Sequence, residues 1–298
     1  MKKNLAYISV LSSDKNKNYR IYRFREEARY LGVNLIEIHP TKTKIIATPE
    51  GIKLYNEFGK IIPDCQAVIR EIVNNKSALA IQKALIANGA NCLSSINKKI
   101  GREKLSDYLL FAKNKLPFPK TFILLDRDNV NLCLDFFEHK FPLVIKFSKT
   151  TSGIGTILIE SEISFNSVID YLLENKSSEY SEPALIQEYI RESKGRDVRV
   201  VVLNNEVIAA VERNNSQNDF RSNISQGGKA RNINLTSQQE GIAIKAVKVL
   251  GLKFGGVDLL FGKKGPLITE VNSPCNIGFV EKKTGINITR KIIQSLFK

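Results

Sequence analysis

Three oxygen-bearing side chains near the C-terminus have types and spacing suited to binding a metal ion. Glu270 and Asn272 lie two residues apart in "PLITEVN", and Asp258 lies in the preceding run "GGVDLLFG". Both runs resemble strands joined by the turn "KKG", so alternation places Glu270 and Asn272 on one face and hairpin pairing brings Asp258 beside them. Two carboxylates and an amide are ligands that Mg²⁺ accepts together with nucleotide phosphates and waters, and Glu270 could bridge two ions. The alternative, an acidic pair on a solvated face, is disfavoured by the apolar neighbours.

A glycine-containing loop, "KTTSGIGT", is a candidate phosphate site. Gly153 and Gly155 let backbone N–H groups approach an anion, and Ser152 adds a hydroxyl donor. The loop is neither a Walker loop nor a Rossmann fingerprint, because it lacks Gly-Lys-Ser/Thr and continues into a strand. A structural hairpin turn would explain its glycines equally well. Lys146 in "LVIKF" favours the phosphate site, because an ammonium within an apolar strand needs an anionic partner.

The elements that must position these residues begin with an alternation of strands and helices. The runs "LAYISVL", "NLIEIHP" and "CQAVIRE" predict strands, and "YRFREEARYLG" and "SALAIQKALIANGANCL" predict helices that stop near Gly32 and Gly89. This order predicts a parallel sheet in a small α/β unit.

The remainder predicts helices and antiparallel hairpins. A helix carrying Leu105, Leu109 and Leu110 precedes the strand, glycine loop and strand of "FPLVIKFSKTTSGIGTILIES", and "FNSVIDYLLENK" predicts another helix. The run "DVRVVVLNNEVIAAVERN" predicts a hairpin that turns at Asn204–Asn205, followed by the helix "SQQEGIAIKAVKVLGL".

Charged and amide side chains are spread over this hairpin and the loop after it. The arginine fork suits carboxylate and phosphoryl groups, although any single arginine is more often a surface charge. The set comprises Asp197, Arg199, Arg213, Arg221 and Asn223.

Composition and charge limit the class of protein. The chain has 298 residues, a net charge of +15 and no apolar run long enough to span a membrane. Its N-terminus fits a first strand better than a signal peptide, so we expect a cytoplasmic protein. The four cysteines form no C-x-x-C pair, which predicts reduced thiols and neither a zinc cluster nor disulfides. The charge either attracts a polyanion or reflects a lysine-rich composition, and both interpretations stay open.

In order along the chain, "VIKFSKTTSGIGT", "LIQEYI", "GRDVRVVV", "AAVERN", "DFRSN", "GGVDLL" and "ITEVN" resemble the ATP-grasp superfamily, and more narrowly the RimK family of α-L-glutamate ligases. The resemblance implies an α/β (α+β ATP-grasp) fold with ATP between its last two domains. It assigns residues 1–95 to an N-terminal α/β domain, 96–183 to a central lid and 184–298 to a C-terminal antiparallel-sheet domain with the metal site.

The same resemblance implies roles for individual residues. Lys104 and Lys146 correspond to phosphate-binding lysines, the latter also catalytic together with Arg221. The glycine loop would cover the phosphates. The other implied positions are the adenine hinge at Glu188 and Tyr189, a ribose contact at Asp197, the triphosphate segment Arg221, Ser222 and Asn223, and the metal ligands Asp258, Glu270 and Asn272.

The activity that the resemblance implies is ATP-dependent amide formation through an acyl phosphate. It implies ATP and two Mg²⁺ ions, with Mn²⁺ as an alternative, and glutamate or another amino acid added to a protein, peptide or small-molecule acceptor, which the basic charge suggests is acidic. Family members are often homo-oligomers. We do not expect a membrane partner or nucleic acid as a direct substrate.

One segment departs from the family pattern and leaves the acceptor open. Where the family continues with a turn of the type "NASPG", this chain has "NSPCNIGF", from Asn272 to Phe279. The first alternative is therefore a tailoring ligase for a coenzyme, carrier protein or peptide natural product. A second, of another class, is a nucleotide-dependent module that binds ribosomes or RNA, although no aromatic RNA-binding signature accompanies the lysines.

Overall fold

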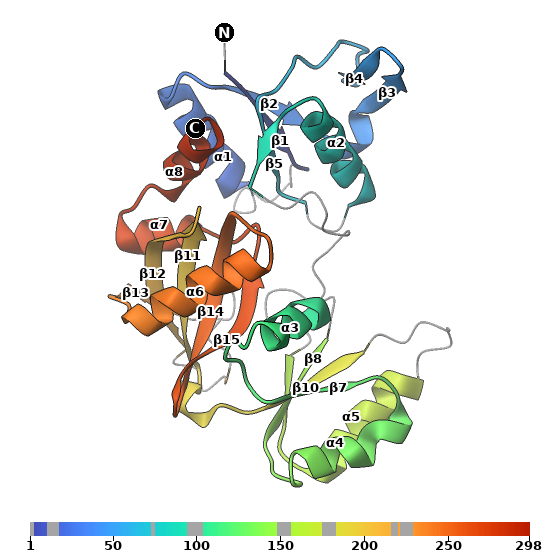
Figure 1. Cartoon of the computed structure of the whole chain (residues 1–298), viewed down its shortest axis with the longest axis vertical. Coiled ribbons are helices and arrows are strands. Elements are labelled where there is room, and N and C mark those ends of the chain that lie inside the picture. The colour runs from blue at the N-terminus through green and yellow to red at the C-terminus, as the bar shows by residue number, and fades with distance from the viewer. Residues whose placement is uncertain are drawn as a thin grey trace.

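The elements are arranged around three main sheets in a computed structural model of the chain (Figure 1). The residues that it describes are 3–10, 18–72, 75–93, 104–147, 156–174, 183–215, 220 and 229–298. A parallel sheet lies at one end, a five-stranded antiparallel sheet in the middle and a four-stranded antiparallel sheet at the other end (Figure 1). No helix within these ranges has both the length and the apolar composition that crossing a bilayer requires.

The N-terminal sheet is parallel, as predicted, and its strand β1 (Asn4–Ile8) is buried on both faces. Its order is β2 (Asn34–Ile38), β1 (Asn4–Ile8), β5 (Ala67–Arg70) and β6 (Asn91–Cys92). Alternate residues of β1 enter two cores, Leu5 and Tyr7 on the side of α1 (Tyr19–Tyr30), Ala6 and Ile8 on the side of α2 (Lys76–Ala87). Both helices are followed by the predicted stop glycines, whose φ angles of +66° and +92° other residues rarely adopt.

A hairpin that was not among the predicted elements extends from this unit. The 3-10 helix η1 (Pro40–Lys42) leads into β3 (Lys44–Thr48), which pairs with β4 (Gly51–Tyr55). All of β3 is exposed, and Leu54 of β4 anchors the hairpin in the core beside α2.

The central sheet has the order β7 (Thr121–Leu124), β10 (Ala184–Glu188), β8 (Leu143–Phe147) and β9 (Thr156–Ile159). The antiparallel pairing of β8 with β9 confirms the predicted hairpin. The 3-10 helix η2 (Arg127–Asn129), α4 (Val130–Phe136) and α5 (Glu162–Glu174) lie beside the sheet, and both α-helices pack on the same core.

Two elements lie outside the domains to which the sequence assigned them. β10 was placed in the C-terminal domain but pairs with β7 and β8 of the central sheet. α3 (Lys104–Lys113) was placed in the central domain, yet its Tyr108 and Phe111 pack in the core of the five-stranded sheet. The boundaries between the central sheet and the five-stranded sheet therefore differ from the predicted ones both before β7 and after β9.

The five-stranded sheet has the order β13 (Lys229–Asn232), β12 (Glu206–Asn214), β11 (Arg196–Leu203), β14 (Phe254–Gly262) and β15 (Gly265–Asn272), with the 3-10 helix η3 (Arg191–Ser193) before β11. The turn between β11 and β12 is at Asn204–Asn205, as predicted, and both residues have positive φ. Val198, Val200 and Val202 face α6 (Ser237–Val249). The opposite face carries charges at one end of β11 and apolar residues, Val201 and Leu203, at the other.

The C-terminal helix of the chain packs against the N-terminal unit. After α7 (Gly278–Thr284), α8 (Ile288–Leu296) packs against α1, and its Ile292 and Ile293 share one core with Leu5 and Phe24. The sequence analysis assigned these residues to the C-terminal domain and did not predict the helix. Its apolar face completes the N-terminal core.

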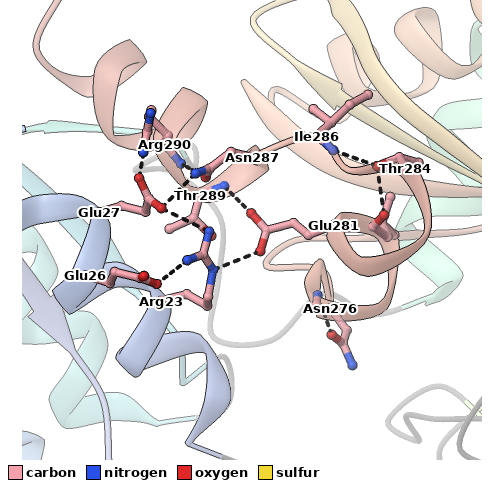
Figure 2. A network of polar contacts seen from close by, with 12 residues as sticks. Arg23, Glu26, Glu27, Asn276, Glu281, Thr284, Ile286, Asn287, Thr289 and Arg290 are labelled. Carbon is pink, nitrogen blue, oxygen red and sulfur yellow. Dashed lines mark hydrogen bonds and ion pairs between the residues drawn. The ribbon is translucent and has the colours of Figure 1, made fainter. Parts of the chain in front are cut away.

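A polar network joins these helices (Figure 2). Glu27 of α1, 3% exposed, accepts hydrogen bonds from Asn287 Nδ2 and Arg290 Nε, both at 2.7 Å, and pairs with Arg23 at 3.0 Å. Glu281 of α7 accepts from the Thr289 backbone N–H at 2.8 Å and from Arg23 Nε at 3.3 Å. Arg23 therefore links two buried carboxylates from distant parts of the sequence.

We predict that Glu27→Ala lowers the free energy of unfolding by about 2–4 kcal/mol, because Asn287 and Arg290 lose a buried acceptor. Urea unfolding of the full chain measures the change. Glu26→Ala is the matched control, because its side chain is 66% exposed on the same helix and contacts the same Arg23. Equal unfolding midpoints for the two variants would contradict the linking role of Glu27.

Candidate active site

Four buried charges lie on the face of the five-stranded sheet opposite α6. Arg199 of β11 is directly opposite Asp258 of β14, and Asp197 is directly opposite Arg213 of β12. Arg199 holds Asp258 through two hydrogen bonds, Nε to Oδ1 and Nη2 to Oδ2, the latter at 2.7 Å. Arg213 holds Asp197 in the same way and also reaches Asp258 Oδ2 at 3.0 Å. We call these four residues the charge lattice.

The charge lattice keeps Asp258 ionised although both of its carboxylates are out of water. Asp258 is 3% exposed and Asp197 is 4% exposed. Burial by itself would raise the pKa of Asp258, but Arg199 and Arg213 hold it below its ordinary value. The sequence placed Asp197 beside a ribose. In the structure its carboxylate is the buried partner of Arg213.

A β-bulge sets the geometry where β14 meets β15. Asp258 pairs with Glu270 and the next residue, Leu259, pairs with Ile268, so Thr269 is an extra residue on β15. Asn272 lies opposite Gly256, two positions along from the Asp258–Glu270 pair. The structure therefore brings Asp258, Glu270 and Asn272 to one face of neighbouring strands, as the hairpin pattern predicted.

These three residues fit a magnesium ion in donor type. A carboxylate has about four acceptor positions, and the two arginines occupy three positions on Asp258, which leaves one on Oδ1. Within the described ranges, Glu270 and Asn272 have no hydrogen bond or ion pair of their side chains, so their oxygens are available. No group of three or more His, Cys, Asp and Glu side chains in the same ranges is arranged around a metal position. The ligand set is thus two carboxylates and an amide.

Two lysines approach this set from other elements. Lys146 of β8 donates from Nζ to Thr269 Oγ1 at 2.6 Å, and Lys104 at the start of α3 donates to the Phe147 carbonyl at 3.2 Å. Burial lowers the pKa of Lys146 to about 8, although Glu270 and Asp258 oppose this shift. Burial, together with the charge of Lys146, also lowers the pKa of Lys104. The two ammonium groups lie close enough to repel each other, and an anionic ligand would relieve this repulsion.

Three polar residues of the site were missed by the sequence interpretation. Tyr108 donates from its hydroxyl to the Thr269 carbonyl at 2.7 Å, and Gln187 of β10, 1% exposed, lies beside that hydroxyl and donates to Thr121 Oγ1 at 2.7 Å. Thr269 itself receives the bond from Lys146. The available signal was polarity within apolar runs, namely Gln187 in "ALIQEYI" and Thr269 in "PLITEVN". The partners of these residues depend on long-range pairing.

The predicted hinge lies at the end of β10. The Glu188 backbone N–H donates to the Lys120 carbonyl at 3.0 Å, and its carboxylate accepts from the Lys120 N–H at 2.7 Å. The Tyr189 ring meets the Phe220 ring edge-on at 6.4 Å between centroids. Glu188 thus secures the edge of the central sheet. An adenine contact here remains a prediction.

Six predicted site residues lie outside the described residues. They are Ser152, Gly153 and Gly155 of the glycine loop, and Arg221, Ser222 and Asn223 of "DFRSN". Their roles remain predictions.

The segment that departs from the family pattern is fixed between two units. Cys275 is buried and its carbonyl accepts from Arg20 of α1, which also pairs with Glu71 at 2.9 Å. A side chain at Gly256 would meet Cys275 Cβ at 2.8 Å, so that glycine lets the segment lie against β14. Cys65, Cys133 and Cys275 are buried thiols. The segment therefore runs from the predicted metal ligand Asn272 to contacts with the N-terminal unit.

We predict that Lys146→Met stabilises the fold near neutral pH by on the order of 1–3 kcal/mol, because a tenfold change in proton affinity is worth roughly 1.4 kcal/mol. The folded pKa of about 8 lies below that of an unfolded lysine, about 10.4. Between these values the unfolded chain binds more protons, so wild-type stability rises with pH there and the advantage of the variant shrinks.

Urea unfolding of both proteins from neutral pH to about pH 10 checks this prediction. The control is Lys140→Met, which makes the same substitution at a side chain that is 76% exposed. If the difference in unfolding free energy between Lys146→Met and wild type stays constant over the pH series, the lowered pKa of Lys146 is contradicted.

Comparisons with known proteins bear on the whole chain. The family model of the RimK-like ATP-grasp domain matches residues 101–296. A probable alpha-L-glutamate ligase of Citrobacter koseri is 34% identical over 96% of this chain and 94% of its own length, and a ribosomal protein bS6–L-glutamate ligase of Escherichia fergusonii is 33% identical over the same shares.

Solved structures share the fold at lower identity. The ATP-grasp ligase PsnB complexed with minimal precursor has a TM-score of 0.76 at 16% identity. The match covers 100% of this chain and 99% of PsnB. The macrocyclase MdnC of Microcystis aeruginosa, bound with the precursor peptide MdnA, has a TM-score of 0.72 at 15% identity, with 99% of each chain covered. The match of the family model over most of the chain and the identity to the curated relatives together show that this chain belongs to the RimK-like ATP-grasp family of ATP-dependent ligases.

Proposed function

We propose that this ATP-dependent ligase joins the amino group of glutamate, or of another amino acid, to a carboxyl group of a protein or peptide acceptor. The observation that carries the proposal is the oxygen set Asp258, Glu270 and Asn272 on one sheet face, with Lys146 reaching it from the central sheet. This arrangement suits a nucleoside triphosphate with its metal ion. The relatives named as glutamate ligases, at 33–34% identity, support the choice of amino acid.

The reaction has two steps, and this chain's residues bind and orient the groups in both. In the first, an acceptor carboxylate oxygen attacks the γ-phosphorus of ATP, a new O–P bond forms, and the bond to ADP breaks. In the second, the amino nitrogen attacks the acyl carbon, the C–N bond forms, the bond from that carbon to the phosphate oxygen breaks so that phosphate leaves, and the nitrogen loses a proton to solvent. The ammonium groups of Lys104 and Lys146 would hold the phosphates in line. Asp258, Glu270 and Asn272 would hold magnesium, which supplies positive charge to the phosphoryl oxygens when bound.

The charge lattice gives this site a suitable electrostatic balance. Its two arginines neutralise two aspartates, so the lattice does not offset the charges of Lys104, Lys146 and Glu270. Neither histidine takes part: His139 lies exposed beside Asp135 and Glu162, and His39 contacts Thr41. A route through a phosphorylated substrate needs no nucleophilic side chain.

The partners and conditions are part of the same proposal. We propose two metal ions, with Mn²⁺ able to replace Mg²⁺, an acidic acceptor attracted by the net charge of +15, a cytoplasmic site of action and a homo-oligomer. The observation favouring a protein or peptide acceptor over a small molecule is the name of the 33% identical relative, which modifies a ribosomal protein.

We predict that Lys146→Ala, Asp258→Ala and Glu270→Ala each reduce amino-acid-dependent ADP release by at least about a hundredfold, because each removes a group placed at the transferring phosphate. A coupled assay for ADP measures this, with Lys140→Ala, exposed on the central unit, as the control. Wild-type turnover in all three variants would refute the site assignment.

We expect a phosphate-release screen of the twenty amino acids against acidic peptides to give its strongest signal with glutamate. Mass spectrometry of the acceptor then identifies the bond and the number of residues added. A signal with another amino acid and none with glutamate would overturn the choice of substrate while leaving the ligase chemistry intact.

A further inference from the structure

The β-bulge leaves Thr269 without a partner on β14. Residues from a different part of the chain supply hydrogen-bond partners for the backbone at the bulge. The Thr269 carbonyl accepts from the Tyr108 hydroxyl at 2.7 Å, and the neighbouring Ile268 N–H donates to the Pro117 carbonyl at 2.9 Å. Since buried backbone groups need partners, residues 108–117 stabilise the bulge from outside the sheet.

Tyr108 is held firmly enough to define a position. Its ring, 3% exposed, meets Phe111 and Phe118 edge-on at 5.9 Å and 5.3 Å between centroids. Burial raises the pKa of its phenol, so the group stays protonated. One hydroxyl proton serves one acceptor, and the 2.7 Å bond to Thr269 is favoured over the 3.4 Å contact with Gln187.

Thr269 also contacts Lys146 through its side chain. The ammonium donates to Thr269 Oγ1 at 2.6 Å and lies 3.5 Å from the Tyr108 hydroxyl oxygen. Lys146 belongs to the central sheet and Thr269 to the five-stranded sheet, so this bond crosses between two units. A lysine has a flexible stem and three donors, so the short bond to Thr269 and the longer contact with Tyr108 limit its motion and leave at least one donor for a ligand.

We propose that Thr269 and Tyr108 are positioning residues that fix the Lys146 ammonium beside the Asp258–Glu270 pair. The lysine side chain is then already ordered before nucleotide phosphates bind to it. Tyr108 fixes the Thr269 backbone, and the Thr269 hydroxyl fixes the ammonium. The proposal rests on nucleotide binding at the proposed site and is independent of which amino acid or acceptor is used. Ordering the lysine in advance lowers the entropy cost of binding.

The test is the affinity of the full chain for a non-hydrolysable ATP analogue with magnesium, measured by calorimetry without amino acid or acceptor. Thr269→Val keeps the shape of the side chain and removes the acceptor, so we expect roughly tenfold weaker binding. Thr269→Ser keeps the hydroxyl and should restore affinity to within about twofold of wild type. Tyr108→Phe should weaken binding by a smaller factor, because it removes only the long 3.5 Å contact with the ammonium and the bond to the Thr269 backbone.

Thr289→Val is the matched control for loss of a buried threonine hydroxyl. Thr289 is fully buried in α8, and its Oγ1 has no hydrogen-bond partner among the described residues, so affinity should not change. The proposal is overturned if Thr269→Val binds the analogue as tightly as wild type or more tightly. It is also overturned if Thr269→Val and Thr269→Ser weaken binding equally. Wild-type binding by Tyr108→Phe overturns the part assigned to Tyr108. Failure of every amino acid in the ligase screen would bear on the proposed substrate and would leave this result unaffected.

Discussion

Mutual neutralisation of Asp197, Arg213, Asp258 and Arg199 is the interaction on which the rest of the site depends. Four ionised groups out of water would be costly individually, and their alternation across β11, β12 and β14 gives each one an opposite neighbour. Asp258 is also the cross-strand neighbour of Glu270 on β15. A candidate metal ligand can thus be buried and ionised at once, because two arginines compensate for its desolvation.

The two antiparallel sheets share apolar contacts, since Leu185 of β10 and Ile123 of β7 join the core of the five-stranded sheet, and they also meet at polar contacts and at one shared helix. Lys146 reaches from the central sheet to Thr269, and Tyr108 of α3 reaches the same residue from the core of the five-stranded sheet. β-Bulges are often found beside active sites, where they redirect a side chain. Here the extra residue is the one that contacts the lysine, so the irregular register creates a link that a regular ladder would lack.

The N-terminal unit contributes a rigid boundary to the segment after the metal strand. Arg20 holds the Cys275 carbonyl, and one apolar core extends from Leu5 and Phe24 to Val201 and Ile292. With the network around Glu27, these contacts join the start of the chain to its end. The segment that departs from the family pattern therefore has a defined place between two units, which makes it a structural candidate for deciding the acceptor.

Local features of the sequence were sufficient for much of this structure. Alternation of apolar residues, the stop glycines and the Asn204–Asn205 turn depend on backbone preferences within a few residues. The parallel N-terminal sheet and the hairpins β8–β9, β11–β12 and β14–β15 were therefore predicted correctly. The two-residue spacing of Glu270 and Asn272, together with a short turn after Asp258, also sufficed to bring the three oxygen donors together.

Other features were decided only by the tertiary structure. The sheet to which β10 belongs, the core that receives α3 and α8, and the hairpin of β3 and β4 involve contacts that cross the sequence boundaries of the predicted units. Asp197 was predicted to contact a ribose, and only the register with β12 showed that it is the partner of Arg213. Thr269 and Tyr108 are 161 positions apart, and neither has chemistry that marks it as functional by itself. The sequence by itself determined which residue types could bind phosphate and metal, whereas their partners depend on strand register and on a bulge, which arise from packing across the whole chain.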